Sequence, residues 1–178
     1  MIGHFEKVSL KQFTNDMLNQ MYLNNCDKTA IEKKKEAIKT MWENIKLPTR
    51  ATDGSAGYDF HIPLEVSVLL HDHREETILT GIRWVGCDEN VVLMLYPRSG
   101  LGFKYGMRFL NTTGVIDKDY CNADNEGHIM AKLVVNKTCC LQPNDRFMQG
   151  IFVPYYVTDD DYTVEKGVRT GGMGSTGR

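Results

Sequence analysis

The sequence lacks several features that mark whole classes of protein. It has no CxxC pair, and its five cysteines are an odd number, which is more typical of reduced thiols than of a disulfide framework. The 21 Lys and Arg against 23 Asp and Glu provide no basic surface for duplex nucleic acid. No apolar run approaches membrane-spanning length, and the first residues, MIGHFEKVSLKQ, lack the apolar centre of a signal peptide. We therefore expect a cytoplasmic protein that binds neither nucleic acid nor a membrane.

The N-terminal segment, residues 1–46, has no proline and no glycine after Gly3. Ser9-Leu10-Lys11-Gln12 is a capping-box pattern, because the Ser9 hydroxyl can accept a hydrogen bond from the backbone N–H three residues on. Apolar residues then recur at helical spacing until Pro48, which cannot continue a helix. We predict a helical hairpin over residues 9–46 whose apolar face packs on the main domain or on a neighbouring subunit. That face carries Leu10, Phe13, Met17, Leu18 and Met21 in the first helix and Ile31, Ile38, Met41, Trp42 and Ile45 in the second.

From residue 47 onward the sequence has a β pattern. Short runs rich in Val, Ile, Leu and aromatic residues alternate with Gly, Asn and Asp. This pattern predicts an all-β domain over residues 47–157, a sandwich or barrel of the jelly-roll type. The remaining residues, 158–178, contain the glycine-rich stretch TGGMGSTG (170–177) and predict a flexible arm. The clearest predicted strands are residues 66–70, 77–82, 91–96, 129–135 and 147–153.

Five polar, glycine-containing segments carry the candidate chemistry. In Arg98-Ser99-Gly100, a guanidinium, a hydroxyl and backbone N–H groups lie together, and phosphate oxygens bind such donors. Asp117 follows a turn, where a carboxylate can accept a hydrogen bond from a water molecule and aim it. Each pattern alone is more often an ordinary turn. The five segments are Ala51–Asp59 (ATDGSAGYD), Pro97–Leu101 (PRSGL), Asn111–Tyr120 (NTTGVIDKDY), Asn144–Gly150 (NDRFMQG) and Arg169–Gly177 (RTGGMGSTG).

In this order the five segments resemble the five motifs of the trimeric dUTPase family, of bacterial or phage type, here with an N-terminal helical extension. The resemblance covers about residues 47–178. It implies a distorted jelly-roll barrel, a homotrimer with shared active sites and a requirement for Mg²⁺. It also implies hydrolysis of dUTP to dUMP and pyrophosphate by in-line attack of water on the α-phosphorus. That reaction keeps uracil out of DNA and supplies dUMP for dTMP synthesis.

The resemblance also implies residue roles. Asp117 would activate the water. Tyr120 would pack against the deoxyribose, so that a 2′-hydroxyl collides with the ring. Asp59 would order the waters of the magnesium ion without binding it directly. The implied substrate-binding residues are Arg98, Ser99 and Gly100 at the triphosphate, Asn111, Gly114, Val115 and Ile116 at the uracil hairpin, Gln149 on the phosphate side, and Arg169, Met173, Gly174, Ser175 and Thr176 in the arm.

Three departures from the family pattern stand out. The arm has Met173 where the family usually has Phe, and it is one residue short between Arg169 and Gly171. A polar insert, residues 121–126, follows Tyr120 and is expected to form a surface loop. Two alternative functions remain: a dCTP deaminase-like enzyme, disfavoured because residues 129–136 contain no Glu, and a phage-type dUTPase that also binds a regulatory protein.

Overall fold

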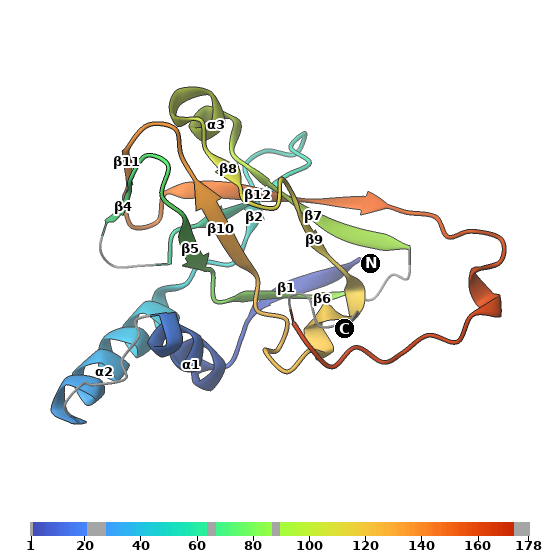
Figure 1. The fold of residues 1–178 in the computed structure, drawn as a ribbon, viewed down its shortest axis with the longest axis horizontal. Helices are drawn as coiled ribbons and strands as arrows, with labels where there is room; N and C mark the ends of the chain where they lie inside the picture. Colours follow the sequence, from blue (N-terminus) through green and yellow to red (C-terminus); the bar gives the residue numbers. More distant parts are fainter. Residues whose placement is uncertain (1, 21–27, 64–66, 87–89, 173–178) are drawn as a thin grey trace.

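The computed structural model describes residues 2–20, 28–63, 67–86 and 90–172, which form short strands and a few helices (Figure 1). No helix in these ranges is long and apolar enough to cross a membrane. Two 3₁₀ turns, η1 (Lys118–Asn122) and η2 (Asp161–Thr163), complete the elements. The helices and strands are β1 (Gly3–Lys7), α1 (Leu10–Gln20), α2 (Lys28–Asn44), β2 (Thr49–Arg50), β3 (Tyr58–His61), β4 (Val68–Leu70), β5 (Glu76–Leu79), β6 (Ile82–Gly86), β7 (Val91–Pro97), α3 (Ser99–Tyr105), β8 (Arg108–Phe109), β9 (Gly114–Ile116), β10 (Met130–Val134), β11 (Cys139–Leu141) and β12 (Arg146–Pro154).

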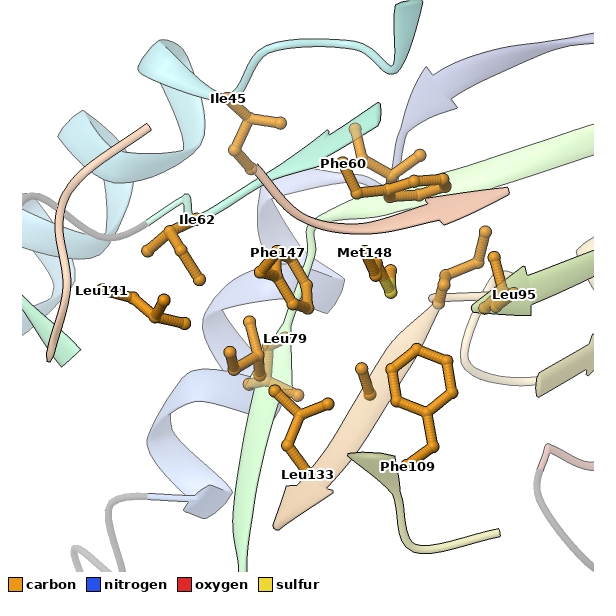
Figure 2. Close-up of a cluster of buried hydrophobic side chains, with 14 of the residues drawn as sticks. Ile45, Phe60, Ile62, Leu79, Leu95, Phe109, Leu133, Leu141, Phe147 and Met148 are labelled. Atoms are coloured by element: carbon orange, nitrogen blue, oxygen red, sulfur yellow. The ribbon is translucent and has the colours of Figure 1, made fainter. Parts of the chain in front are cut away.

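The strands pair antiparallel in several small sheets. The largest has the order β2-β3-β12-β7-β9, and a second has the order β5-β10-β8. Apolar side chains from β3, β7, β10 and β12 meet between these sheets, where Phe147 and Met148 are fully buried (Figure 2). Inward-facing side chains of β10 and β12 build this interior, and a register shift between Arg146 and Met148 accompanies the burial of the adjacent Phe147 and Met148. The all-β prediction is therefore confirmed.

The N-terminal segment contains the two predicted helices, α1 and α2, and residues 21–27 between them lie outside the described ranges. The predicted cap is present, since the Gln12 backbone N–H donates to Ser9 Oγ at 3.1 Å. The sequence pattern did not predict β1, which pairs antiparallel with β6 from Gly3 opposite Gly86 to Lys7 opposite Ile82. Its partner strand lies far along the chain, so no local pattern reveals the pairing.

The apolar faces of α1 and α2 pack on the barrel of the same chain, which answers the question that the sequence left open. Phe13 and Ile38 are almost completely buried in the common core, as is Ile45 just after α2. The Trp42 indole N–H donates to Val8 O at 2.8 Å and ties α2 to the end of β1. Figure 1 shows the two helices side by side at one end of the barrel, next to β5.

The predicted strand 77–82 is wrong as a single strand, because the chain turns at Thr80-Gly81 and forms β5 and β6 separately. Gly81 has φ +70°, a left-handed conformation that favours glycine. The Thr80 hydroxyl donates to Ile129 O at 2.6 Å and accepts from the Ile82 N–H at 3.1 Å, which fixes the turn. A local pattern of β-forming residues does not report such a break.

We predict that Gly81→Ala destabilises the protein. A Cβ atom at this position would overlap Ile45 Cδ1 and press on the Phe13 ring, in addition to the backbone strain. Overpacking of this kind costs about 1–3 kcal/mol, so we expect a lower free energy of unfolding in urea. Gly54→Ala is the control, because its Cβ position has no neighbour within 4 Å. Equal stability of the two variants would contradict this account of the turn.

Candidate active site

One cluster of candidate residues lies where β9 ends. Asp117 has an extended backbone and η1 begins at the next residue. Nη1 of Arg169, from the C-terminal arm, donates to Asp117 Oδ2 at 2.9 Å and to Asp119 Oδ1 at 3.2 Å. These three side chains line a pocket of about 730 Å³ together with Lys118. Asp117 therefore faces a cleft that carries cationic groups, as a residue acting on a phosphate ester requires.

Tyr120 lies under the same arm residue. The Arg169 guanidinium carbon is 5.0 Å from the centroid of the Tyr120 ring, and only 5% of Tyr120 is exposed. The phenol O–H donates to His128 O at 2.9 Å and accepts from Asn125 Nδ2 at 2.8 Å. Burial raises the pKa of the Tyr120 phenol, an effect that Asn125 and Arg169 oppose. The ring is thus fixed by hydrogen bonds, and the guanidinium covers the surface where a sugar is expected.

A second cluster forms around Asp59 on β3. One carboxylate oxygen lies 3.3 Å from Arg98 Nε, and the other accepts a hydrogen bond from Arg146 Nη1 at 3.0 Å. Gln149 on β12 is in register with Asp59. The Asp59 side chain is only 10% exposed, so the two guanidinium groups compensate a nearly buried charge. Asp59 therefore holds both arginines in place.

Arg98 ends the extended segment after β7, and Ser99 and Gly100 begin helix α3 instead of forming a simple turn. The sequence did not predict this helix. Arg98 and Ser99 lie between two cavities of about 280 and 700 Å³. The smaller one is lined by Ala51, Ser55, Ala56, Gly57, Asp59, Arg98, Ser99, Gln149 and Ile151.

The larger cavity is lined by several cationic residues, among them Lys46, Arg98, Lys104 and Arg146. His61 also lines it. Burial is the main cause that lowers the pKa of this imidazole. Lys46, Arg146 and Arg98 lower the pKa further, whereas Asp59 raises it. The cationic lining indicates a positive electrostatic potential. The Arg98 side of the barrel therefore suits an anionic ligand.

The two clusters are far apart within one chain. In the antiparallel pair β7–β9, Ile116 lies opposite Leu93. Continuing this register places Asp117 beside Val92. Arg98 lies about six residues after Val92, which corresponds to roughly 20 Å at the rise of a β-strand. The pocket at Asp117 shares no lining residue with either cavity at Arg98. One chain alone does not bring Asp117 and Arg98 to the same phosphate.

The predicted uracil hairpin links β8 to β9. Asn111 is exposed in its turn, where its carbonyl accepts a hydrogen bond from Thr113 N at 2.7 Å. Gly114, Val115 and Ile116 form β9, and half of Val115 is exposed (53%). The arm residues Met173, Gly174, Ser175 and Thr176 lie outside the described residues. The roles assigned to all of these residues stay predictions.

The insert after Tyr120 is more than a surface loop, because it contacts both ends of the chain. Glu126 accepts hydrogen bonds from the Ser9 N–H (2.7 Å) and hydroxyl (2.6 Å), and the Asp124 N–H donates to Thr170 O at 3.0 Å. The sequence pattern also did not predict the buried His128 and its partner Asp16 on α1. No sequence signal exists for contacts between residues more than a hundred positions apart.

The described residues contain no group of three His, Cys, Asp or Glu side chains arranged for a metal ion. Both oxygens of Asp59 already contact arginines, and Asp117 and Asp119 share Arg169. A divalent cation at this site would therefore take most of its ligands from a bound polyphosphate and from water, the environment that magnesium prefers.

Comparison with known proteins agrees with this geometry. The family model described as dUTPase matches residues 43–177. The deoxyuridine 5′-triphosphate nucleotidohydrolase of Lactococcus lactis is 38% identical over 145 residues, which cover 79% of this chain and 95% of that protein. The protein of the same name from Photorhabdus laumondii is 36% identical over 143 residues, covering 76% of this chain and 90% of that protein.

Solved structures extend the comparison to the fold. The crystal structure of the dUTPase from Streptococcus mutans superposes with a TM-score of 0.59 at 28% identity, covering 88% of this chain and 98% of that one. The dUTPase from phage phi11 of S. aureus shares the fold at 20% identity, with a TM-score of 0.55 over 70% of this chain and 90% of that one. The matched segment holds all five motifs and both clusters, and the chain belongs to the dUTPase family.

Proposed function

We propose that this chain hydrolyses dUTP to dUMP and pyrophosphate in the cytoplasm, and that it does so as a homotrimer with shared active sites. The observation that carries the proposal is Asp117, an accessible carboxylate that lines a pocket together with Arg169 and Lys118, in a chain that belongs to the dUTPase family. The named relatives are nucleotidohydrolases of deoxyuridine 5′-triphosphate, which supports the choice of substrate.

Asp117 accepts a proton from a water molecule and directs its oxygen at the α-phosphorus. The new P–O bond forms in line with the bridging oxygen that leaves as part of pyrophosphate, so water is consumed and two products form. Assistance of this kind contributes about 10²–10⁴-fold to a rate. More than half of the Asp117 side chain is exposed (54%), so a water molecule and a phosphate group can reach it.

Arg169 leaves Asp117 when the triphosphate binds and pairs with its outer phosphates. Ion pairs to exposed carboxylates contribute only about 0–1 kcal/mol, so a triphosphate of higher charge competes well for the guanidinium. The deoxyribose then takes the place of Arg169 on the Tyr120 ring. The rest of the arm, with Met173 on the uracil and Gly174, Ser175 and Thr176 on the phosphates, closes the site.

Arg98, Ser99 and Gly100 hold the triphosphate near the scissile bond, with Gln149 beside them. Asp59 fixes the direction of Arg98 through the contact described above. Magnesium, when bound with the substrate, neutralises part of the phosphate charge. Because both oxygens of Asp59 face guanidinium groups, Asp59 acts on the metal through water at most.

The separation of the two clusters supports an assembly of subunits with shared sites. Asp117 and Arg98 lie roughly 20 Å apart by strand geometry, so one subunit supplies Asp117 to the Arg98 of another. The segment that follows β12 and helix α3 add support, because both carry large apolar side chains that the single chain leaves exposed. These are Phe103 (95% exposed), Tyr156 (94%), Tyr162 (86%) and Val168 (89%). Surfaces of this kind mark contact sites.

No observation favours dCTP deamination. The only charged residue of β10 is Lys132, and its ammonium group pairs with Glu75 at 2.6 Å. The strand thus offers no carboxylate to manage protons at the base. Ammonia release from dCTP would overturn this conclusion.

We predict that Asp117→Asn lowers kcat for dUTP by roughly 10²–10⁴-fold and changes the dissociation constant of a non-hydrolysable dUTP analogue little. An amide cannot accept the proton of the attacking water. Asp119→Asn is the matched control, because its carboxylate is equally exposed and contacts the same guanidinium. Pyrophosphate release measures both. Equal losses in the two variants would remove Asp117 from its special role.

We predict that Tyr120→Ala lowers the preference for dUTP over UTP by roughly tenfold or more, because the surface that excludes a 2′-hydroxyl is lost. The measurement is the ratio of kcat/KM for the two nucleotides. Tyr120→Phe keeps the ring and loses only the two hydrogen bonds of the hydroxyl, so it should retain more of the preference. An unchanged ratio in the alanine variant would exclude Tyr120 from sugar selection.

We predict that co-expression of Arg98→Ala and Asp117→Asn chains restores activity that neither variant has alone. If each site takes Arg98 from one subunit and Asp117 from another, about a quarter of the sites in randomly mixed trimers are intact. The activity of each variant expressed alone gives the baseline. A mixture that remains as inactive as its components would contradict sharing between subunits.

A further inference from the structure

His128 is a fully buried histidine that the proposed reaction does not use. It is 0% exposed, and it lies two residues after the insert that follows Tyr120. Its Nδ1 lies 2.6 Å from Asp16 Oδ2 on α1, and its Nε2 lies 2.8 Å from the Gly81 backbone nitrogen. The imidazole thus joins the N-terminal helix, the β5–β6 turn and the insert.

These partners assign the tautomer of His128. A backbone N–H can only donate, so Nε2 accepts from Gly81 and the ring proton is on Nδ1. Nδ1–H therefore donates to Asp16, which also accepts a hydrogen bond from the Gln12 amide at 2.9 Å. Asp16 thus accepts the hydrogen bond of a buried N–H group, and the Asp16 side chain itself is 14% exposed. Loss of Asp16 would leave the buried N–H of His128 without its acceptor, an unfavourable condition that favours a shift of this segment.

The same residue fixes Tyr120 through its main chain. The Tyr120 hydroxyl donates to the carbonyl oxygen of His128, and the Asn125 amide donates to that hydroxyl. A shift of the His128 backbone therefore moves the acceptor that sets the tilt of the Tyr120 ring. A second contact holds the same loop, because Glu126 accepts both hydrogen bonds from Ser9 at the start of α1.

We propose that α1, through Asp16 and Ser9, is a positioning element for Tyr120 and thereby contributes to the choice of deoxyribose over ribose. Asp16 acts through His128, and Ser9 acts through Glu126. The matched dUTPase segment begins at residue 43, so both residues lie outside it. The effect on selectivity rests on the proposed function of Tyr120, whereas the mechanical coupling of α1 to residues 118–128 does not.

The test compares Asp16→Ala with Asp16→Asn in the full-length chain. Alanine removes the acceptor of His128 Nδ1–H, whereas the side-chain oxygen of asparagine restores it. Asn15→Ala is the control, because Asn15 is exposed on the same helix. Two quantities are measured: the ratio of kcat/KM for dUTP and UTP, and amide hydrogen exchange of peptides over residues 118–128 without ligand.

We expect Asp16→Ala to speed exchange in residues 118–128 and to lower the dUTP/UTP ratio by roughly fivefold or more, the loss that corresponds to one buried hydrogen bond. The loss should appear mainly in KM for dUTP, because Asp117 itself is not displaced. Asp16→Asn should recover most of both effects, and Asn15→Ala should match the wild-type protein. Glu126→Ala, at a more exposed site, should also speed exchange and lower the dUTP/UTP ratio. This variant replaces Asp16→Ala in the test if Asp16→Ala does not fold.

An unchanged ratio in both Asp16→Ala and Glu126→Ala, with dUTP turnover retained, would overturn the proposal. So would an equal loss in Asp16→Asn or in Asn15→Ala. If the wild-type chain releases no pyrophosphate from dUTP, the proposed function fails and sugar selection fails with it. The exchange measurement still decides whether α1 holds the insert, so the two failures are distinguishable.

Discussion

The length of strand β7 is the constraint on which the rest of the structure depends. It pairs with β12 on one edge and with β9 on the other, so it places Arg98 at its end and Asp117 beside its beginning. A strand in a sheet cannot shorten, and this spacing is therefore rigid. Two consequences follow if both residues act on one substrate: the site lies between subunits, and the chain needs apolar surface for such contacts. The exposed side chains of α3 and of the arm supply that surface.

The two aspartates contact arginines in different ways, and the difference suits different tasks. Asp59 is nearly buried between Arg98 and Arg146, so removal of either arginine would leave its charge poorly compensated. This contact is a fixed part of the barrel. Asp117 is half exposed, and its contact with Arg169 is weak enough to exchange for a substrate phosphate. A rigid carboxylate thus orients a phosphate-binding group, while an accessible one remains free to act on water.

The N-terminal helices are integrated into the barrel and are more than an attached cap. Their apolar faces enter the common core, and Gly81 gives them room at the β5–β6 turn. The same turn binds His128 through its backbone N–H. Packing of α1 and the position of the insert are therefore coupled through one small region. This coupling explains why the polar insert next to Tyr120 is held by specific hydrogen bonds although its sequence is typical of a loop.

The sequence by itself determined whatever depends on neighbouring residues. The Ser9 cap, the two helical stripes, the β pattern after residue 47 and the order of the five motifs are local or serial features, and they predicted the fold class and the family. Tertiary structure alone decided the pairing of β1 with β6, the break at Gly81, the Asp16–His128 contact and the position of Arg169 over Asp117 and Tyr120. Each of these joins residues distant along the chain, and a hydrogen bond or packed contact of that kind exists only after the whole barrel has brought its partners together.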